Sequence, residues 1–501
     1  MLAGVRQRRT AGTGTLTARG VVQGVVGRGL NFVFAYLATV MLARRLGPAA
    51  YGVYGVVVSV LIWIEQTARF TVPPAAAKLI PEDRIRSPLV QQTALFLGSI
   101  LFGALFVVLW TAAVPLAAVF KLSDTGVALF RTAALDLPLF GLYAIYRGVL
   151  QGRHDFLALA IADALYAAAK LAAVILLLGL WLSVASALVA NVIASFAALV
   201  FVMSRASIPF RRPSSAVVGP LMRLALPLGL YMLALQTITH LDLWALTALE
   251  AGRNAGTLGL YVAARNVAIV PGVVLMVVSD VLLPSLSRAL AADDARLPPA
   301  YIRGAVRFLA ILVVPIVLAL VVSANDIMSV LYSGEFRSGG TYLRALVVYA
   351  ALLPFMDLFA SILSARGEPY RGGVTLAVVI PAAVALNLFL IPRYGPMGAA
   401  YASGLAGIAG TAALGVLVFR RWGGFVAGRT LVNIAVAASA ATLVAQQLAV
   451  RALNPITVCA ASLTVYGAVL LVLRELRRED VEPFAFWKWT AAGRRELSGD
   501  L

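Results

Sequence analysis

Long apolar stretches alternate with short polar segments along almost the whole chain. The first stretch covers residues 21–46, which is long enough to span a membrane, because an α-helix crosses a bilayer in roughly 20 residues. The same criterion predicts about fourteen spans in all, and therefore an all-α membrane protein. Their approximate ranges are 21–43, 52–76, 88–112, 128–150, 157–180, 183–203, 220–247, 257–284, 301–324, 341–364, 373–391, 396–419, 430–450 and 453–473.

The composition excludes a soluble globular protein and offers no catalytic signature. Hydrophobic residues make up 61% of the 501 residues, charged residues 13%, and the mean hydropathy is +0.92. One cysteine, Cys459, cannot form an internal disulfide, and two histidines, His154 and His240, argue against a histidine metal site. The chain has no G-x-x-x-x-G-K-[ST] phosphate loop and no H-E-x-x-H motif. We expect neither an enzyme nor a resident cofactor.

The basic residues indicate membrane topology rather than nucleic-acid binding, although the net charge is +19. With alternating spans and a cytoplasmic N-terminus, 28 of the 41 lysine and arginine residues lie in cytoplasmic segments, 9 lie on the other side and 4 lie within spans. This asymmetry follows the positive-inside rule. It supports fourteen spans with both termini in the cytoplasm, and it supports the break near residues 179–183, where no charge separates two apolar stretches.

Two pairs of short motifs indicate an internal repeat. AYGVY at 50–54 is similar to TLGLY at 257–261, and LQGRHDF at 150–156 is similar to LSARGEPY at 363–370. Six spans per repeat is an even number, so both halves enter the membrane from the same side and are related by an axis along its normal. The predicted organisation is an N-tail (1–19), an N-lobe of six helices (20–204), a basic linker (205–219), a C-lobe of six helices (220–420), two further helices (421–474) and a C-tail (475–501).

Ionisable residues within the predicted spans are candidates for function, because hydrocarbon penalises charge. Arg28 shares a helical face with Gly24 and Asn31, so it either faces a polar cavity or extends back to the headgroups. Glu65 and Arg69 are four residues apart, so a local ion pair is an alternative to a functional role. The full set is Arg28, Glu65, Arg69, Asp136, Asp163 and Lys170 in the first half, and Asp242, Arg265, Asp280 and Asp357 in the second.

The charged residues of the second half leave further alternatives open. Arg265 lies near the predicted outer end of its span and either binds substrate or extends to the membrane surface. Asp280 is expected near the opposite surface. Asp242 and Asp357 lie deeper and have no cation nearby in sequence, so each is a proton site, a cation site or a partner across the gap between the lobes.

Several of these segments together resemble one family of membrane proteins. GTLGLYVAARNVAIVPGVVLMVVSDVLLPSLSRAL, IMSVLYSGEF, FASILSARGEPYRG and NLFLIPRYGPMGAAYAS in the second half, with RLGPAAYGVYGVVVSV and YRGVLQGRHDF in the first, resemble the Wzx-like oligosaccharide flippases. This family belongs to the multidrug/oligosaccharidyl-lipid/polysaccharide exporter (MOP) superfamily. The resemblance covers about residues 20–420. It implies two lobes facing a central cavity, and alternating access that moves undecaprenyl-pyrophosphate-linked oligosaccharide from the inner to the outer leaflet.

The resemblance and the charges together give a predicted site. A pyrophosphate needs cations, and the guanidinium fork of arginine suits phosphate. The predicted substrate-binding residues are Arg28, Asn31, Arg69, Lys170 and Arg265, with Arg28, Arg69 and Lys170 as the pyrophosphate-binding set. The predicted coupling residues or charge partners are Glu65, Asp163, Asp242 and Asp357. Coupling to H+, to Na+ or to the membrane potential is left open.

The remaining expectations follow the same family. The partners are the lipid-linked oligosaccharide, membrane lipids and a polysaccharide polymerase or glycosyltransferases, with no nucleic acid, and the protein is a monomer of the bacterial inner membrane. Two alternatives are a flippase for lipid II, the peptidoglycan precursor, and a multidrug or cation antiporter of the same superfamily.

Overall fold

The protein is described here by a computed structural model. It covers residues 2–83, 85–122, 124–181, 183–250, 255–272, 297–365, 368–423, 428–450 and 454–475. Within these residues all regular secondary structure is helical, which confirms the predicted all-α fold.

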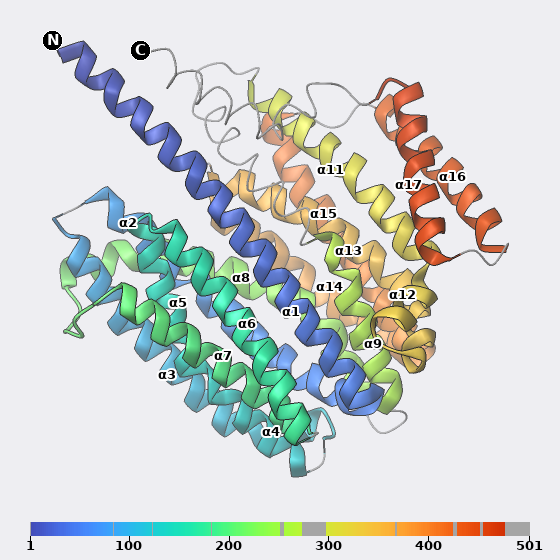
Figure 1. Cartoon of the computed structure of the whole chain (residues 1–501), viewed down its shortest axis with the longest axis horizontal. Helices are drawn as coiled ribbons and strands as arrows, with labels where there is room; N and C mark the ends of the chain where they lie inside the picture. The colour runs from blue at the N-terminus through green and yellow to red at the C-terminus, as the bar shows by residue number, and fades with distance from the viewer. Residues whose placement is uncertain are drawn as a thin grey trace.

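The helices form two bundles that lie side by side, with the last two helices at one edge (Figure 1). The first bundle contains α1 (Leu2–Arg69), α2 (Val72–Glu82), α3 (Ser87–Val119), α4 (Asp124–Ala134), α5 (Asp136–Gly152), α6 (Phe156–Leu180) and α7 (Val184–Arg205). The second contains α8 (Ser215–Glu250), α9 (Ala255–Ala268), α11 (Leu297–Val322), α12 (Ala324–Leu331), the 3-10 helix η1 (Gly334–Gly339), α13 (Gly340–Ala365), α14 (Pro369–Tyr394) and α15 (Pro396–Trp422). The pair at the edge is α16 (Gly428–Val450) and α17 (Pro455–Val472).

Described helices match thirteen of the fourteen predicted spans. The described residues contain eleven helical stretches that are long and apolar enough to cross a membrane. One of them, Gly29–Glu82, covers two predicted spans, and Thr457–Val472 is a shorter apolar helix that matches the last one. The remaining span, 257–284, is described only as far as residue 272, where its first part forms α9.

The first two spans meet at a glycine inside α1. Gly47 has φ 71° and ψ 171°, a backbone conformation that side chains with a Cβ rarely adopt. Pro48 follows it and has no backbone N–H to donate to the preceding turn. The chain therefore changes direction at this position without leaving helical structure for more than one residue. The backbone of α1 begins at Leu2, so the segment predicted as an N-tail is helical.

Two breaks between helices have clear local causes. At the predicted break near residues 179–183, α6 ends at Leu180, and the Ser183 Oγ accepts a hydrogen bond from the Ser186 N–H at the start of α7. The α4–α5 break at Leu135 precedes Pro138, whose ring would clash with a carbonyl four residues earlier in a continuous helix. This second break places Asp136 in the first turn of α5, where the helix dipole favours a negative charge.

The short helices α12 and η1 lie in a segment that the hydropathy pattern predicts only as a connection between spans. Arg44 of α1 donates hydrogen bonds to the carbonyl oxygens of Val330 and Leu331 at the end of α12. Tyr332 and Phe336 pack beside Tyr51 of α1, with ring centroids 6.3 and 6.1 Å away. This connection therefore joins the second bundle to the first.

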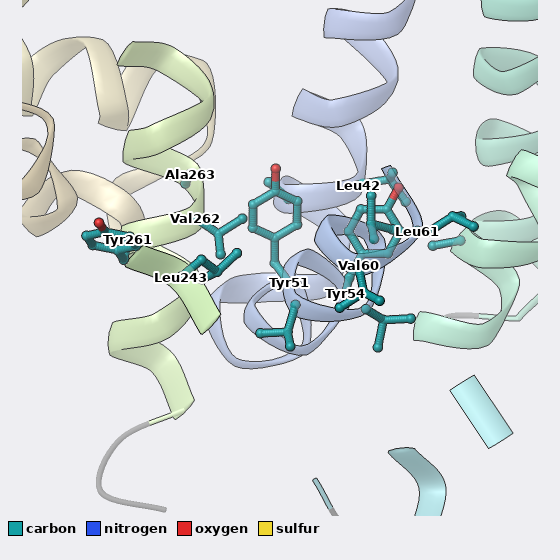
Figure 2. Packing of buried hydrophobic residues seen from close by; sticks show 14 of the residues in the cluster. Leu42, Tyr51, Tyr54, Val60, Leu61, Leu243, Tyr261, Val262 and Ala263 are labelled. Atoms are coloured by element: carbon teal, nitrogen blue, oxygen red, sulfur yellow. The ribbon is translucent and has the colours of Figure 1, made fainter. Parts of the chain in front are cut away.

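A shared apolar core holds the two bundles together along the second half of α1. Tyr51 lies beside Leu243 of α8 and Val262 of α9, with Tyr54 on its other side, as Figure 2 shows. Polar contacts accompany this core. The Trp244 Nε1–H of α8 donates to Ser59 Oγ at 2.9 Å, the Trp63 Nε1–H donates to Thr237 Oγ1 at 3.0 Å, and the Asn266 amide donates to the Tyr51 hydroxyl at 2.8 Å.

Glycines permit the closest approach between the bundles. A Cβ on Gly259 of α9 would lie 1.7 Å from the Pro48 carbonyl oxygen, and a Cβ on Gly55 would lie 2.5 Å from Val262 Cγ1. The first overlap is with backbone, so no side-chain rotation relieves it. The two helices must move apart before any side chain fits at position 259.

We expect Gly259→Ala to separate α1 from α9 and to lower the melting temperature, because overpacking a close contact costs about 1–3 kcal/mol. In a Cys459→Ser background, spin labels at the exposed residues Arg45 and Thr341 should report a longer or broader distance by pulsed electron paramagnetic resonance. Gly304→Ala is the matched control, because nothing lies within 4 Å of the added Cβ. An unchanged distance in Gly259→Ala would contradict the close approach.

Candidate functional site

The strongest ion pair in the first bundle joins α5 to α6. The Arg147 Nε–H and Nη2–H donate to the two carboxylate oxygens of Asp163, each at 2.7 Å. The Tyr143 hydroxyl donates a third hydrogen bond to Asp163 at 2.7 Å. Two parallel bonds from one guanidinium are the strongest geometry for such a pair. Asp163 is therefore fully occupied as the partner of Arg147.

Asn31 contacts the same part of α6 but makes a structural bond. Its side-chain amide donates to the Asp163 backbone carbonyl oxygen at 2.6 Å, which ties α1 to α6. Next to the ion pair, Tyr143 and Tyr166 stack with their ring centroids 5.8 Å apart and an interplanar angle of 7°. The first lobe therefore presents aromatic rings and hydroxyl groups beside a charged pair.

Arg69 lies close to this network without a carboxylate of its own. It neighbours Arg147 and Asp163, and its guanidinium carbon lies 5.9 Å from the centroid of the Phe140 ring. Among the described residues, Arg69 forms no ion pair. The interpretation of Glu65 and Arg69 as a local ion pair is therefore wrong, because Glu65 turns to another residue.

Glu65 lies beside Asp136. Both side chains are buried, with exposed fractions of 5% and 1%, and each lies near Lys170 of α6. In the described part of the chain, neither Glu65 Oε1 nor either carboxyl oxygen of Asp136 has a hydrogen-bond partner. Lys170 is half-buried. The first lobe thus holds a second group of charged side chains, and no ion pair joins them among the described residues.

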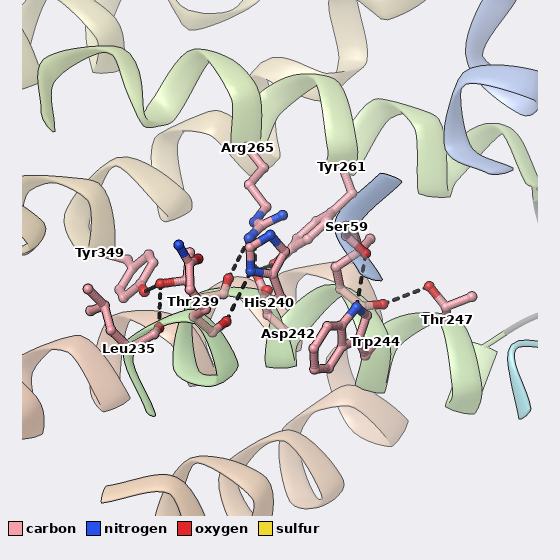
Figure 3. A network of polar contacts seen from close by, with 12 residues as sticks. Ser59, Leu235, Thr239, His240, Asp242, Trp244, Thr247, Tyr261, Arg265 and Tyr349 are labelled. Carbon is pink, nitrogen blue, oxygen red and sulfur yellow. Dashed lines mark hydrogen bonds and ion pairs between the residues drawn. The ribbon is translucent and has the colours of Figure 1, made fainter. Parts of the chain in front are cut away.

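In the second lobe, Asp242 of α8 is neutralised from within that lobe (Figure 3). The Tyr261 hydroxyl of α9 donates to Asp242 Oδ2 at 2.7 Å, and Arg265 Nε lies 3.8 Å from the same oxygen. Arg265 also donates to the Thr239 backbone carbonyl oxygen. Arg265 is only 8% exposed, so the prediction that it extends to the membrane surface is wrong. Asp242 has a cation from its own lobe, so the alternative that it pairs with a residue across the gap between the lobes is also wrong.

The remaining predicted residues are placed as follows. Asp357 lies on α13 next to Tyr231 of α8, with no ion pair among the described residues. Arg28 lies on α1, but its side chain is outside the described residues, as is Asp280. Of the predicted site residues, the structure brings Glu65, Arg69, Asp163 and Lys170 together in the first lobe, close to Asp136 and Arg147. In contrast, Asn31, Asp242 and Arg265 are engaged in bonds that stabilise packing.

Sequence reasoning missed the role of Arg147 by assigning it to a cytoplasmic segment. The structure places it inside α5, one turn after Tyr143, with its side chain 20% exposed. The spacing of Tyr143 and Arg147, at i and i+4 on one helical face, was a readable signal. Ser195 of α7, which lies beside Asp136, carried no such signal because serine is common in membrane helices.

This arrangement can bind an anion in the first lobe. Once Asp163 has neutralised Arg147, two cations (Arg69 and Lys170) and two carboxyl groups (Glu65 and Asp136) remain around the same space. Among the described residues, no group of three or more histidine, cysteine, aspartate or glutamate side chains gathers. The chemistry present is therefore charge recognition by arginine and lysine.

Solved structures of other proteins share this fold. A lipid II flippase MurJ in an inward closed conformation aligns with a TM-score of 0.74 over 91% of this chain and 99% of that one, at 14% identity. An inward-facing MATE multidrug resistance transporter of the MOP superfamily aligns with a TM-score of 0.67 over 79% of this chain and 98% of that one, at 15% identity. At these identities the likeness concerns the fold.

Sequence comparison adds one relative and one family. The probable lipid II flippase MurJ of Rhizobium tropici is 27% identical over 190 residues, which are 37% of this chain and 36% of that protein. The chain thus matches about a third of that relative's length. The model of the family described as polysaccharide biosynthesis protein matches residues 17–290, more than half of the chain. The resemblance drawn from the sequence motifs is confirmed, and the chain belongs to the polysaccharide biosynthesis protein family.

Proposed function

We propose that this protein is a flippase that moves an undecaprenyl-pyrophosphate-linked oligosaccharide from the inner to the outer leaflet of the bacterial inner membrane. The movement proceeds by alternating access between the two lobes and requires no ATP hydrolysis by this chain. Both termini lie in the cytoplasm in this proposal, in agreement with the distribution of basic residues.

The observation that carries the proposal is Arg69, a cation inside a membrane-spanning helix that forms no ion pair among the described residues. A charge in this position is costly unless a partner compensates it. An incoming pyrophosphate supplies that partner, and the planar guanidinium can donate two parallel hydrogen bonds to it. Lys170 on α6 supplies a second positive charge toward the same space.

The glycan and the lipid tail set the remaining physical requirements. A sugar with many hydroxyl groups cannot enter hydrocarbon without losing its hydrogen bonds to water, so it must cross in a polar cavity. The aromatic rings and hydroxyl groups of Tyr143 and Tyr166 suit such a cavity wall. The lipid tail can remain among the membrane lipids. A polysaccharide polymerase or glycosyltransferases would act before and after this step.

The proposal is tested in cells that lack the gene for this protein and have no second flippase. We expect intracellular lipid-linked repeats to accumulate and the surface polymer to disappear, and we expect the intact gene to restore both. Arg69→Ala should fail to restore them although the protein is inserted at normal levels. Surface polymer at the parental level in the strain without the gene would contradict the proposal.

A lipid II flippase is the second candidate, because the curated relative carries that name. Both substrates present a pyrophosphate, so the same cations can bind either one. The two substrates differ in the glycan, which therefore determines which of them is transported. Purified protein in liposomes should be given each lipid in turn, with a membrane-impermeant reagent that detects only the outer leaflet. Transfer of the oligosaccharide lipid without transfer of lipid II supports the first candidate, and the reverse supports the second.

A further inference from the structure

Two carboxyl groups meet in the interior of the first lobe. Glu65 is 5% exposed and Asp136 is 1% exposed, and their side chains lie next to each other although α1 and α5 are far apart in sequence. Glu65 Oε1 and both carboxyl oxygens of Asp136 have no hydrogen-bond partner among the described residues. Two neighbouring carboxylates that are both ionised repel each other strongly, and a single proton shared between them removes this repulsion.

A third buried polar group points to the same place. Ser195 of α7 is 0% exposed, and its hydroxyl faces the carboxyl group of Asp136. A hydroxyl group both donates and accepts, so Ser195 can serve either protonation state of the carboxyl group beside it. Ser195 therefore belongs to the same buried polar cluster as the two carboxyl groups.

The other groups that face the pair are few. Arg69 lies one turn from Glu65 on α1, and Tyr166 and Lys170 face the pair from α6. The Arg147–Asp163 pair lies beyond Arg69 and is already neutral as a unit. The charges that respond to the carboxyl pair are therefore those of Arg69 and Lys170.

Counting these charges shows what one proton changes. With both carboxyl groups ionised, two negative charges balance the two cations, and the charges of these four groups sum to zero. With one proton bound, a single negative charge remains, and the cluster carries a net positive charge. In a medium of low dielectric constant, one elementary charge alters the attraction for a polyanion strongly.

We propose that Glu65 and Asp136 form a proton-binding site whose occupancy sets the affinity of the first lobe for a diphosphate. With the proton bound, Arg69 and Lys170 are available to the anion, and without it the two carboxylates hold them. Ion binding is then coupled to substrate binding at Glu65 and Asp136 in the first lobe, because Asp242 in the second lobe already has Arg265 as its partner. This inference rests on the proposed function only for the identity of the anion.

The sign of the linkage follows from reciprocity. If proton binding strengthens diphosphate binding, diphosphate binding must take up a proton to the same extent. Diphosphate affinity is then highest at low pH and falls as the pH rises through the titration of the pair. Glu65→Gln and Asp136→Asn remove one ionisable group each, so the cluster of Arg69, Lys170 and the remaining carboxylate keeps a net positive charge as the pH rises and the affinity stops varying with pH.

The test is calorimetry of the full-length protein in detergent with inorganic pyrophosphate, in two buffers of different ionisation enthalpy. Wild type should take up about one proton per pyrophosphate near the midpoint of the titration, and both variants should take up almost none. Glu82→Gln, an exposed change at the end of α2, should behave as wild type. Tight pyrophosphate binding by wild type without proton uptake at any pH would overturn the proposal and would leave the proposed function standing.

A second measurement needs no ligand. The infrared band of a protonated carboxyl group should be present in wild type and in Glu82→Gln, and should be lost in both Glu65→Gln and Asp136→Asn. Absence of this band from wild type at the pH of pyrophosphate binding would overturn the proposal. So would an affinity that depends on Na+ when Na+ is replaced by choline, because the pair would then hold a metal cation. If wild type shows the band but binds no pyrophosphate, the proposed function fails and the proton site remains.

Discussion

Replacing Arg147 with alanine should destabilise the folded protein by about 3–5 kcal/mol, because the change leaves a buried carboxylate without its cation. Asp163 would keep only the hydrogen bond from Tyr143. The two bonds that Arg147 makes, each 2.7 Å long, join α5 to α6, so their loss should also loosen the packing of these helices. We expect a clearly lower melting temperature of the detergent-purified protein.

The matched control for this prediction is an exposed ion pair. Arg86 lies 3.4 Å from Asp83, but the two side chains are 63% and 46% exposed, and an exposed pair contributes only about 0–1 kcal/mol. Arg86→Ala should therefore change the melting temperature little. Removing both partners with Arg147→Met and Asp163→Leu should restore much of the loss, because no unpaired charge is left behind. Equal effects of Arg147→Ala and Arg86→Ala would contradict the importance of burial.

The fold was predictable because the membrane imposes the pattern that the sequence displays. Hydrocarbon requires long apolar helices, and the asymmetry of basic residues orients them. The break between α6 and α7 shows how far this information reaches. No charged residue marks it, yet the alternation of all later spans depends on it, and Ser183 caps the new helix where it was expected.

The partners of the charged residues were not predictable in the same way. Glu65 and Arg69 are four residues apart on α1, and sequence spacing favours a pair between them. In the folded chain Glu65 meets Asp136 and Arg69 lies near Arg147, because packing of α5 and α6 against α1 decides which groups approach each side of the helix. Sequence spacing carries no information on contacts between helices.

The break between α4 and α5 illustrates the same limit. A proline such as Pro138 indicates an interruption of the span, but its consequence for function depends on where the new helix begins. Because α5 starts at Asp136, this carboxyl group lies in a first turn and points toward Glu65. A proline in a span indicates a break, whereas the residue that the break exposes to a neighbouring helix is known only from the structure.

Replacing Arg69 with alanine should abolish transport while the protein still folds and inserts. Arg69 forms no ion pair among the described residues, so we expect its removal to weaken binding of the anion rather than the packing of the helices. A charge-assisted hydrogen bond contributes about 1.5–3 kcal/mol, which is about 10- to 150-fold in affinity. We therefore expect inorganic pyrophosphate to bind the purified Arg69→Ala variant at least about tenfold more weakly.

Further variants separate a role in substrate binding from a role in packing. Arg69→Lys should recover only part of the affinity, because lysine keeps the charge and loses the planar fork. Arg131→Ala is the matched control, since Arg131 also lies over an aromatic ring, 5.4 Å from the Trp110 centroid, but is exposed on α4. It should transport normally. Adding Glu65→Gln to Arg69→Ala should not restore transport, because the second change supplies no cation for the diphosphate in place of Arg69. Normal transport by the double variant would mean that Arg69 only balances Glu65, and the diphosphate would then have to be bound by other cations of the chain.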